Sequence, residues 1–392
     1  MLALATNALQ PGMVLAKTIF DEQGQVLLRQ GAQLTHDYIS NLKRRGFTKV
    51  YIDDGNTTDI VIEDLLPEEI RRNAQDALVR VFDFVRQISA DISSDDTDKT
   101  IAAIKTTDVT NTLRNYEGFT QLEESVTSIL DELNNEEMLT GISQIQGHDD
   151  AIFSHSVEVT VAALMIGKRL HLTREDLKRL GAGCILHDIG KIFVMPKTNK
   201  GAPLTTDQKK ILREHPRLGY ELLRTRNPNA VMTNHVALQH HERQDGRGYP
   251  RGLRGHNTIN RPRSSNTKNI LLIAEIAAVA DAYDILSANR PGRQFLSPRQ
   301  VADTMCRLSG TVLNREIVQL FLSMLPILPT GMNIVVSSGR YANYKGVVVK
   351  ANREQEDQPL IRLLFNPQGD HIVPIDLDLA KESTITVEAV LR

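Results

Sequence analysis

The sequence predicts a multidomain protein in which a central all-α domain is flanked by a small N-terminal α+β region and a small C-terminal β domain. Three observations indicate this. The chain has 392 residues, which is more than one domain usually holds. From about residue 66 to residue 325, apolar residues recur at helical spacing between polar loops. Short β-branched runs with glycine turns occupy both ends.

Residues 1–65 are predicted to form the small α+β domain. MVLAKTIF and QVLLRQ are strand-like runs around a turn at Asp21 to Gly24, and TKVYID is a further strand candidate. Thr35 can cap a helix over HDYISNLKRR, and Gly46 follows its end. No catalytic signature occurs in this segment.

Residues 66–144 are predicted to contain long helices that serve as a linker or dimerisation region. Pro67 can open a first helix, EEIRRNAQDALVRVFDFVRQISADI, whose apolar residues keep a helical period. A polar break at SSDDTDK precedes a second long helix, expected within residues 100–134. Paired helices of this kind can dimerise, transmit a signal or simply pack on the next domain. The sequence leaves these alternatives open, and with them a homodimer.

The pattern changes near PILPTG, residues 326–331. Residues 145–328 are predicted to form the all-α domain and residues 329–392 a small β-barrel or sheet. The second assignment depends on NIVVSSGRYANYKGVVVK and PLIRLLFNPQGDHIVPIDLDL, in which β-branched or alternating runs lie between glycine turns.

Composition excludes several classes of function. The net charge of −2 and the pI near 6.6 argue against binding of nucleic acid polymers or anionic membranes. No run of 18 apolar residues exists, so no membrane span is expected. Cys184 and Cys306 are the only cysteines, which is no disulfide framework, and the first residues do not resemble a secretory signal. A cytoplasmic location is expected.

The segment HHERQDGRGYP, residues 240–250, places two histidines side by side. Neighbouring residues on a helix point about 100° apart, so such a pair suits a helix end, where both rings reach past the last turn. Two imidazoles that converge there suggest a metal site. Taken alone, however, the pair is more often solvated or hydrogen-bonded.

Other segments of the central domain add ligand types. CILHDIGKI contains His187 and Asp188, an imidazole beside a carboxylate whose two oxygens can bridge two cations. EHPRLGYELL places His215 at a helix start. His155 lies on the apolar stripe of HSVEVTVAALMIGKRL, where a core histidine is the simpler interpretation of that residue alone.

The strongest single anomaly is the pair Asp281 and Asp284 in ILLIAEIAAVADAYDILS. They are i, i+3 on one face of an otherwise apolar helix. A buried carboxylate is costly unless it is paired or binds a metal. A purely structural role for the domain would leave both residues without compensation.

Shared use of Asp188 divides these residues into two ligand sets, each with open positions for water. One metal would be held by His155, His187, Asp188 and Asp281, and the other by Asp188, His215, His240 and His241. Mixed imidazole and carboxylate ligands without thiolate suit iron or manganese, while zinc, nickel and cobalt stay open. Two divalent transition metal ions are therefore predicted.

HDIGK, EHPxxGY, HHExxDGxGYP and ADAYD, in this order, resemble the HD-GYP domain, a subfamily of the HD metal-dependent phosphohydrolases of bacterial signalling. The resemblance covers about residues 145–325. It implies an HD-type helical fold with a two- or three-metal centre that hydrolyses cyclic di-GMP to pGpG or GMP. It also implies that the GYP loop could dock a diguanylate cyclase or another signalling protein.

The resemblance assigns roles to further residues. Lys191 would contact the scissile phosphate, Asp284 would position substrate or water, and Arg293 would lie near the phosphate or base. Ala151 stands where some members carry a glutamate that supports a third metal, so two metals are expected. The usual Arg-Pro-Tyr-Arg is Arg290–Arg293 with Gly292 in place of the aromatic residue, which puts base stacking in doubt.

Two rival functions stay open at this stage. The domain could be a weakly active or inactive receptor for cyclic di-GMP, or it could hydrolyse another cyclic dinucleotide such as cyclic GMP-AMP. The loop RGHNTINRPRSSNTKN, residues 254–269, is longer than usual in the family. Its basic residues could form a lid over an anion or a partner surface, or the loop could be a disordered insertion. These residues are Arg254, Arg261, Arg263 and Lys268.

Overall fold

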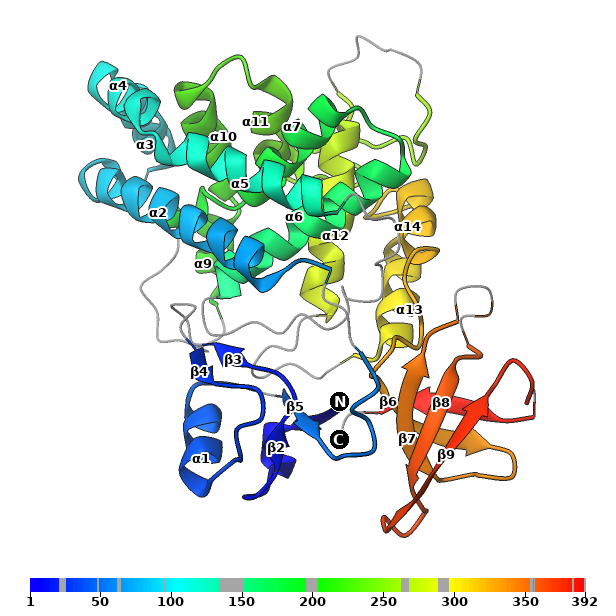
Figure 1. The fold of residues 1–392 in the computed structure, drawn as a ribbon. Helices are drawn as coiled ribbons and strands as arrows, with labels where there is room; N and C mark the ends of the chain where they lie inside the picture. The colour runs from blue at the N-terminus through cyan, green and yellow to red at the C-terminus, as the bar shows by residue number, and fades with distance from the viewer. Residues whose placement is uncertain are drawn as a thin grey trace.

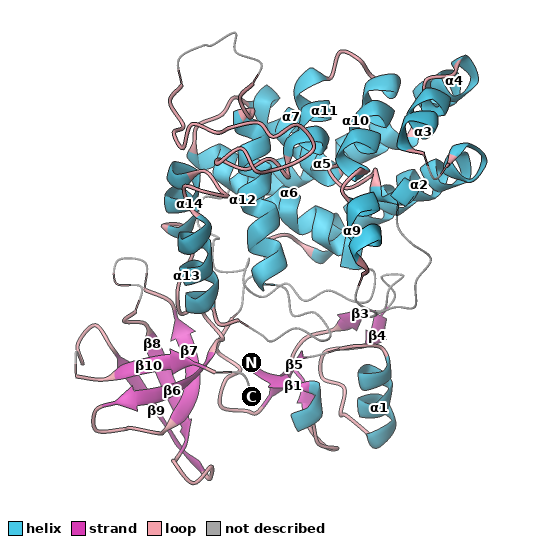
Figure 2. Cartoon of the chain, turned by 180° about the vertical axis from the view of Figure 1, so that it is seen from behind, coloured by secondary structure: helices cyan, strands magenta, loops and turns pink. Residues whose placement is uncertain are grey.

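The structure of the chain is a computed structural model. It describes residues 1–20, 26–47, 49–61, 65–94, 96–133, 151–194, 204–261, 268–287, 296–352, 355, 357–382 and 384–390. A large helical body lies above two small β-containing units, and the two chain termini lie near each other between those units (Figures 1 and 2). Helices and strands therefore segregate along the chain as the sequence predicts. The predicted turn at 21–24 lies outside the described residues.

In its described residues, the N-terminal unit contains two small sheets, one α-helix and one short 3₁₀ helix. Strands β1 (Leu2–Ala5), β5 (Lys49–Asp53) and β2 (Val14–Leu15) form an antiparallel sheet in the order β1-β5-β2. Strands β3 (Ile19–Phe20) and β4 (Val26–Leu28) pair with each other, and a 3₁₀ helix spans Thr6–Ala8. Helix α1 (His36–Arg44) begins where predicted, because the Thr35 side chain accepts a hydrogen bond from the Tyr38 amide.

Between Pro67 and residue 133, the described residues form four helices: α2 (Glu68–Ile92), α3 (Thr97–Ile104), α4 (Thr107–Asn115) and α5 (Gly118–Glu132). The single long helix expected within residues 100–134 is wrong, because this stretch is divided into α3, α4 and α5. Asp96 caps the start of α3, and the extended backbone of Thr106 and Tyr116 interrupts the helical run at both ends of α4.

The remaining helices carry the predicted site. They are α6 (Ala151–Arg169), α7 (Arg174–Ile185), α8 (Lys191–Val194), α9 (Thr206–Leu212), α10 (His215–Arg226), α11 (Val231–Gln239), α12 (Leu272–Ser287), α13 (Pro298–Leu308) and α14 (Arg315–Leu322). One hydrophobic core runs from Leu65 to Phe321. Because α2 and α5 contribute to this core, they pack directly on the helices that follow them (Figure 1).

The C-terminal segment folds as predicted into β structure, in the form of a five-stranded antiparallel sheet. The strands are β6 (Asn333–Ser338), β7 (Lys345–Lys350), β8 (Leu360–Phe365), β9 (His371–Asp378) and β10 (Thr386–Ala389), in the order β10-β6-β7-β8-β9. Ile334 and Val336 of β6 and Ile361 and Leu363 of β8 are buried in the core of this sheet, whereas Leu364 and Phe365 at the end of β8 are buried against the N-terminal unit.

The two small units share part of their core. Val347, Leu364 and Phe365 of the C-terminal sheet belong to the hydrophobic cluster of the N-terminal unit. Arg362 on β8 reinforces this junction: its guanidinium lies 2.6 Å from Asp59 Oδ1 and 2.7 Å from Asp376 Oδ1. Segments separated by about 300 residues thus form one packed region.

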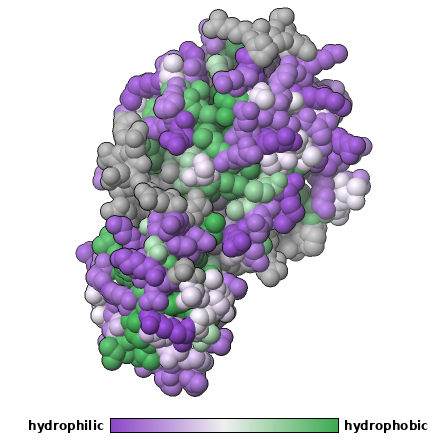
Figure 3. Space-filling model, turned by 90° about the vertical axis from the view of Figure 1, so that its right-hand side faces the viewer, coloured by the Kyte–Doolittle hydropathy of each residue, from purple (hydrophilic) through white to green (hydrophobic). Residues whose placement is uncertain are grey.

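The surface on the side of the C-terminal sheet is mostly hydrophilic, with hydrophobic residues gathered in a band across the helical part (Figure 3). Large exposed apolar side chains are scattered among the described residues, for example Val61, Ile211 and Val373. In the part of the chain that the structure describes, no helix is long and apolar enough to cross a membrane.

Candidate metal centre

The structure brings all seven predicted metal ligands together inside the helical body, although they come from five places in the chain. They are His155 on α6, His187 and Asp188 between α7 and α8, His215 at the start of α10, His240 and His241 at the end of α11, and Asp281 on α12. All are buried except His241, which is partly exposed. His241 therefore marks the side of the cluster nearest to solvent.

Close backbone packing sets the position of the His187–Asp188 turn. A Cβ atom on Gly190 would collide with the carbonyl oxygen of His215, and the Gly219 amide is nearly as close. The absence of a side chain at Gly190 lets this turn approach α10, which brings His187 and Asp188 towards His215.

Asp188 is the centre of a first group with His215, His240 and His241. Its Oδ1 atom lies 3.3 Å from His215 Nε2 and 3.8 Å from His240 Nε2. Ligand atoms of all four residues lie within 4.8 Å of one another. Atoms that each lie about 2.0–2.2 Å from one ion are at most about 4.4 Å apart. The group therefore has nearly the size that a single cation requires.

A second group uses the other oxygen of the same carboxylate. Asp188 Oδ2 lies 3.5 Å from His187 Nε2 and 3.8 Å from His155 Nε2. Ligand atoms of His155, His187 and Asp188 again lie within 4.8 Å of one another. Asp281 Oδ1 lies beside this group, 3.2 Å from His155 Nε2. Asp188 thus faces the two groups with its two oxygens, as a bridging ligand would.

Hydrogen bonds orient three of the imidazoles. The Nδ1 atom of His187 lies 2.6 Å from the Cys184 carbonyl, that of His215 lies 2.7 Å from the Leu212 carbonyl, and that of His240 lies 2.9 Å from the Ala237 carbonyl. A carbonyl oxygen can only accept, so each Nδ1 carries the proton and each ring points its Nε2 atom into the cluster. This arrangement is typical of metal-binding histidines.

Burial and neighbouring charges determine which groups are ionised. Burial lowers the pKa of His187, lowers that of His240 well below its usual range, and lowers that of His241 to about 3. Burial also opposes protonation of His155, but Asp281 and Asp284 outweigh it and raise its pKa to about 9. Three imidazoles are therefore neutral at pH 7 and offer lone pairs to a cation.

Asp188 itself is ionised. Burial opposes the charge, but Lys191 and the surrounding histidines outweigh that effect and hold the pKa of Asp188 well below its usual range. In the described part of the chain, its buried Oδ1 atom has no hydrogen-bond donor in good geometry. A buried ionised oxygen without a donor is unstable unless a positive charge lies beside it. The residues therefore fit a divalent cation.

Asp284 lies on the same helix face as Asp281 but contacts a different atom. Its Oδ2 atom lies 2.6 Å from Nδ1 of His155. The carboxylate therefore orients this imidazole from behind, as the backbone carbonyls do for the rings of His187, His215 and His240. This contact accounts for the second acidic residue of the α12 anomaly.

Lys191 lies at the edge of the cluster. Its ammonium group forms an ion pair with Asp188 Oδ2, and its side chain is 24% exposed, against 2% for Asp188. Lys191 therefore places a positive charge between the buried carboxylate and the solvent. Arg293, the third predicted substrate-binding residue, lies outside the described residues.

The histidine pair lies at a helix end, as predicted. His240 is the C-cap of α11, and the chain then turns through the glycines to Tyr249. The Glu242 carboxylate accepts hydrogen bonds from the amides of Arg251 and Leu253, 2.7 and 2.8 Å away. These contacts hold the Gly-Tyr-Pro segment against the histidine pair.

Sequence reasoning missed the role of the tyrosine in this segment. The Tyr249 ring stacks on His241 with ring centroids 4.8 Å apart and an interplanar angle of 26°. The Arg213 guanidinium lies 5.4 Å from the centre of the same ring. The tyrosine thus covers the most exposed ligand of the cluster. The signal was present in the GYP motif, but its contact with His241 depends on how the turn folds back.

Arg261 of the 254–269 loop is not a lid residue. Its guanidinium forms an ion pair with the buried Glu275 of α12 and donates to the Thr258 and Ile270 carbonyls, both 2.9 Å away. Glu275 also accepts hydrogen bonds of 2.8 Å from Gln244 and Asn314. A buried carboxylate requires such partners, so this part of the loop packs inward. Arg263 lies outside the described residues.

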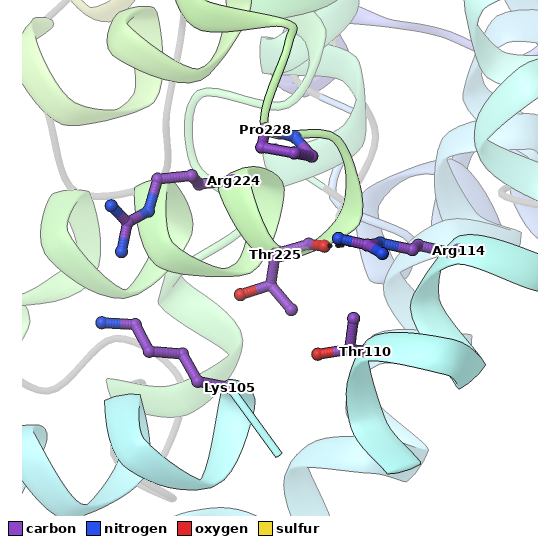
Figure 4. A pocket seen from close by; sticks show the side chains of 6 residues that line it. All are labelled: Lys105, Thr110, Arg114, Arg224, Thr225 and Pro228. Atoms are coloured by element: carbon purple, nitrogen blue, oxygen red, sulfur yellow. Dashed lines mark hydrogen bonds between the residues drawn. The ribbon is translucent and has the colours of Figure 1, made fainter. Parts of the chain in front are cut away.

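A separate cavity of about 260 Å³ lies between α4 and the end of α10, lined by Lys105, Thr110, Arg114, Arg224, Thr225 and Pro228 (Figure 4). Its cations contact neighbouring groups. Lys105 lies 3.2 Å from Glu221, and Arg114 donates to the Thr225 carbonyl at 3.3 Å. Basic side chains commonly stabilise the last carbonyls of a helix in this way. None of the predicted site residues lines this cavity.

Comparison with known proteins agrees with the geometry. The family model "HD domain" matches residues 152–286, a range that contains all seven clustered residues. The match to the HD domain and the similarity to the proteins below support an assignment to the HD-GYP family. It is 27% identical over 255 residues, 64% of this chain and 58% of the relative, to cyclic di-GMP phosphodiesterase PA4108 of Pseudomonas aeruginosa.

Two further relatives match shorter segments. The chain is 36% identical over 132 residues to the cyclic di-GMP phosphodiesterase response regulator RpfG of Xanthomonas campestris, which covers 33% of this chain and 32% of RpfG. It is 28% identical over 176 residues to 3′3′-cGAMP-specific phosphodiesterase 3 of Vibrio cholerae, which covers 45% of this chain and 35% of that protein. The chain thus spans 58% or less of each of these three relatives.

Proposed function

We propose that this HD-GYP protein is a metal-dependent phosphodiesterase that hydrolyses cyclic di-GMP to pGpG, GMP or both. The observation that carries the proposal is the bridging position of Asp188, whose two oxygens face two separate groups of imidazoles. Two cations held side by side by a shared carboxylate are a recurrent device for cleaving phosphodiesters. The names of the relatives support cyclic di-GMP as substrate.

The proposed ligands are the seven clustered residues. His155, His187, Asp188 and Asp281 would hold one divalent metal, and Asp188, His215, His240 and His241 the other. Nitrogen and oxygen donors favour iron or manganese, with zinc, nickel or cobalt as alternatives. Cys184 is close to His187 in the chain, but burial raises the pKa of its thiol beyond the range in which a thiolate forms at pH 7.

Bound metals would stabilise charge on the phosphate and lower the pKa of a water molecule to about 7. The protein side chains then have defined tasks. Lys191, partly exposed beside Asp188, would contact the scissile phosphate and stabilise charge that develops on its oxygens. Asp284, bonded to His155 Nδ1, would hold that ring in its binding orientation and lie near substrate or water. Arg293 would bind the phosphate or base.

Because Gly292 stands where the family usually has an aromatic residue, two alternative functions stay open. The protein could bind cyclic di-GMP with little turnover, as a receptor, or it could prefer another cyclic dinucleotide. The second alternative has a specific support, since one relative is named as specific for 3′3′-cGAMP. A comparison of products and rates on both dinucleotides distinguishes these possibilities.

Further proposals concern the whole chain. We place the protein in the cytoplasm, and we propose that the GYP loop docks a diguanylate cyclase or another signalling protein. Residues 1–65, 66–144, 145–328 and 329–392 would be the N-terminal, helical, catalytic and C-terminal β regions, and the helical region could support a homodimer. Size-exclusion chromatography with light scattering tests the dimer.

The deciding experiment uses purified protein loaded anaerobically with iron or manganese. It is incubated with cyclic di-GMP, and the products are resolved by chromatography. We expect pGpG or GMP from the wild type and none from the variant His187→Ala/Asp188→Ala. Full metal occupancy without product from any cyclic dinucleotide would leave only the receptor alternative.

A further inference from the structure

The helix before the HD-GYP domain, α2, makes a buried polar contact with the helix that carries His155. The Arg71 guanidinium forms an ion pair with the Glu158 carboxylate of α6. Only 10% and 9% of these two side chains is exposed. None of the roles assigned to the metal centre uses this pair, and ion pairs buried this deeply are uncommon in proteins.

Two more contacts lie beside this ion pair. Gln75 Nε2 donates to Ser154 Oγ at 3.2 Å. Phe82 meets Phe153 edge to face, with ring centroids 5.2 Å apart. On α2, the residues at positions 71, 75 and 82 fall on one stripe, because spacings of four and seven residues return to nearly the same side of a helix. The two helices therefore run past each other in opposite directions at this contact.

The partners on α6 bracket His155. Phe153 and Ser154 precede it directly, and Glu158 follows it by three residues, nearly one turn. A side-chain tip lies roughly 5–6 Å from a helix axis, so a rotation of α6 by about 10° would move the imidazole by about 1 Å. Metal sites tolerate misplacements of only about 0.5 Å. Contacts that prevent this rotation therefore bear directly on His155.

We propose that Arg71 and Glu158 are positioning residues of the metal centre, which hold α6 at the rotation that directs His155 to its metal. The proposal rests on the proposed function only for its effect on turnover. Its effect on metal content depends on the cluster alone. Asp284 orients the His155 ring from behind, and α2 orients the helix from which that ring projects.

The test replaces one partner at a time, as Glu158→Gln and Arg71→Met, in the full chain. Metals are counted by mass spectrometry after loading with manganese, and turnover of cyclic di-GMP is measured well below the thermal midpoint of each variant. We expect metal content to fall from about two ions per chain towards one. We also expect kcat to fall roughly tenfold or more, with KM nearly unchanged, as for other residues behind a metal ligand.

A control variant separates the loss of this ion pair from the loss of another contact with the preceding helices. Glu123→Gln removes another ion pair between the preceding helices and the domain, Glu123 to Arg226 at 2.8 Å, which does not touch α6. We expect this variant to keep both metals. If the Arg71 or Glu158 variants do not fold, the milder Gln75→Leu/Ser154→Ala variant carries the test, and a smaller loss in the same direction is expected.

Two metals and wild-type kcat in the folded Glu158→Gln and Arg71→Met variants would overturn the proposal. So would a wild-type chain that binds a single ion and keeps that ion in the His155→Ala variant, because the His155 group would then hold none. A wild type that binds two ions but hydrolyses no cyclic dinucleotide defeats the proposed function instead, and the metal count still decides the role of the ion pair.

Discussion

The Nε2 atom of His215 lies 3.2 Å from the Nε2 atom of His240. Both rings use an Nδ1 proton on a backbone carbonyl, so when both rings are neutral the two facing atoms are lone pairs rather than a donor and an acceptor. Two lone pairs at this distance repel each other unless a cation lies between them. The backbone positions of these two helix ends therefore favour binding of a cation between the two rings.

Loss of the shared carboxylate should remove both metals. In Asp188→Asn the bridging charge is gone, while the buried volume is nearly conserved, so we expect fewer than one ion per chain and no measurable hydrolysis. Asp281→Asn is the matched comparison, because Asp281 lies beside only the His155 group. It should lose one ion and keep the other. Equal metal content in the two variants would contradict the bridging role.

Loss of the lysine should spare the metals and slow the reaction. Lys191→Met removes the partly exposed ammonium beside Asp188 but none of the clustered ligands. We expect two ions per chain and a fall in kcat of roughly a hundredfold, the usual effect of removing one charge-stabilising donor. Metal content and steady-state kinetics on the same preparation check this. An unchanged kcat would disprove the assigned role.

The stacked tyrosine should matter through its ring and not through its hydroxyl. Tyr249 covers His241 with its ring, so the Tyr249→Phe variant should bind metal like the wild type. In Tyr249→Ala, the metal affinity of the group that contains His241 should fall about tenfold. Competition with a chelator of known affinity measures this. Equal loss in both variants would point to the hydroxyl instead.

The buried Glu275 should be important for stability. Glu275→Ala would leave the Arg261 charge and the Gln244 and Asn314 amides without their common partner. We expect a loss of about 3–5 kcal/mol in the free energy of unfolding, measured with urea. The exposed pair between Arg86 and Asp83 serves as control, and Asp83→Ala should cost less than about 1 kcal/mol.

The junction between the two small units should weaken in acid. The hydrogen bond from Arg362 lowers the pKa of Asp59 below its ordinary value of 3.8. Because the pKa of Asp59 is lower in the folded chain, the ionised carboxylate stabilises the fold at pH values above the unfolded-state pKa. This stabilisation is lost as the pH falls through the folded-state pKa. Asp59 is well exposed, so the effect should stay below about 1 kcal/mol. The pH dependence of unfolding in the wild type and in Asp59→Asn measures it. A difference that persists unchanged at pH 2 would contradict the assignment.

The sequence by itself determined the seven clustered residues, the helix end under the histidine pair and the change to β structure near residue 331. Each of these features is recognised from residue types within a short motif, whose own residues are positioned by local backbone geometry. The division of residues 100–134 into three helices was not predicted, because short helices with polar breaks depend on packing more than on periodicity.

Only the tertiary structure decided which contacts join distant segments. It assigned one oxygen of Asp188 to each group, placed Asp284 behind His155, turned Arg261 inward to Glu275 and set Arg71 against Glu158. The local sequence does not specify such partners, because the residues around a charged side chain do not indicate whether it will be solvated or paired with a carboxylate a hundred residues away. The packing of helices around one core brings these groups together, and the cost of burying an unpaired charge then requires that each of them has a partner.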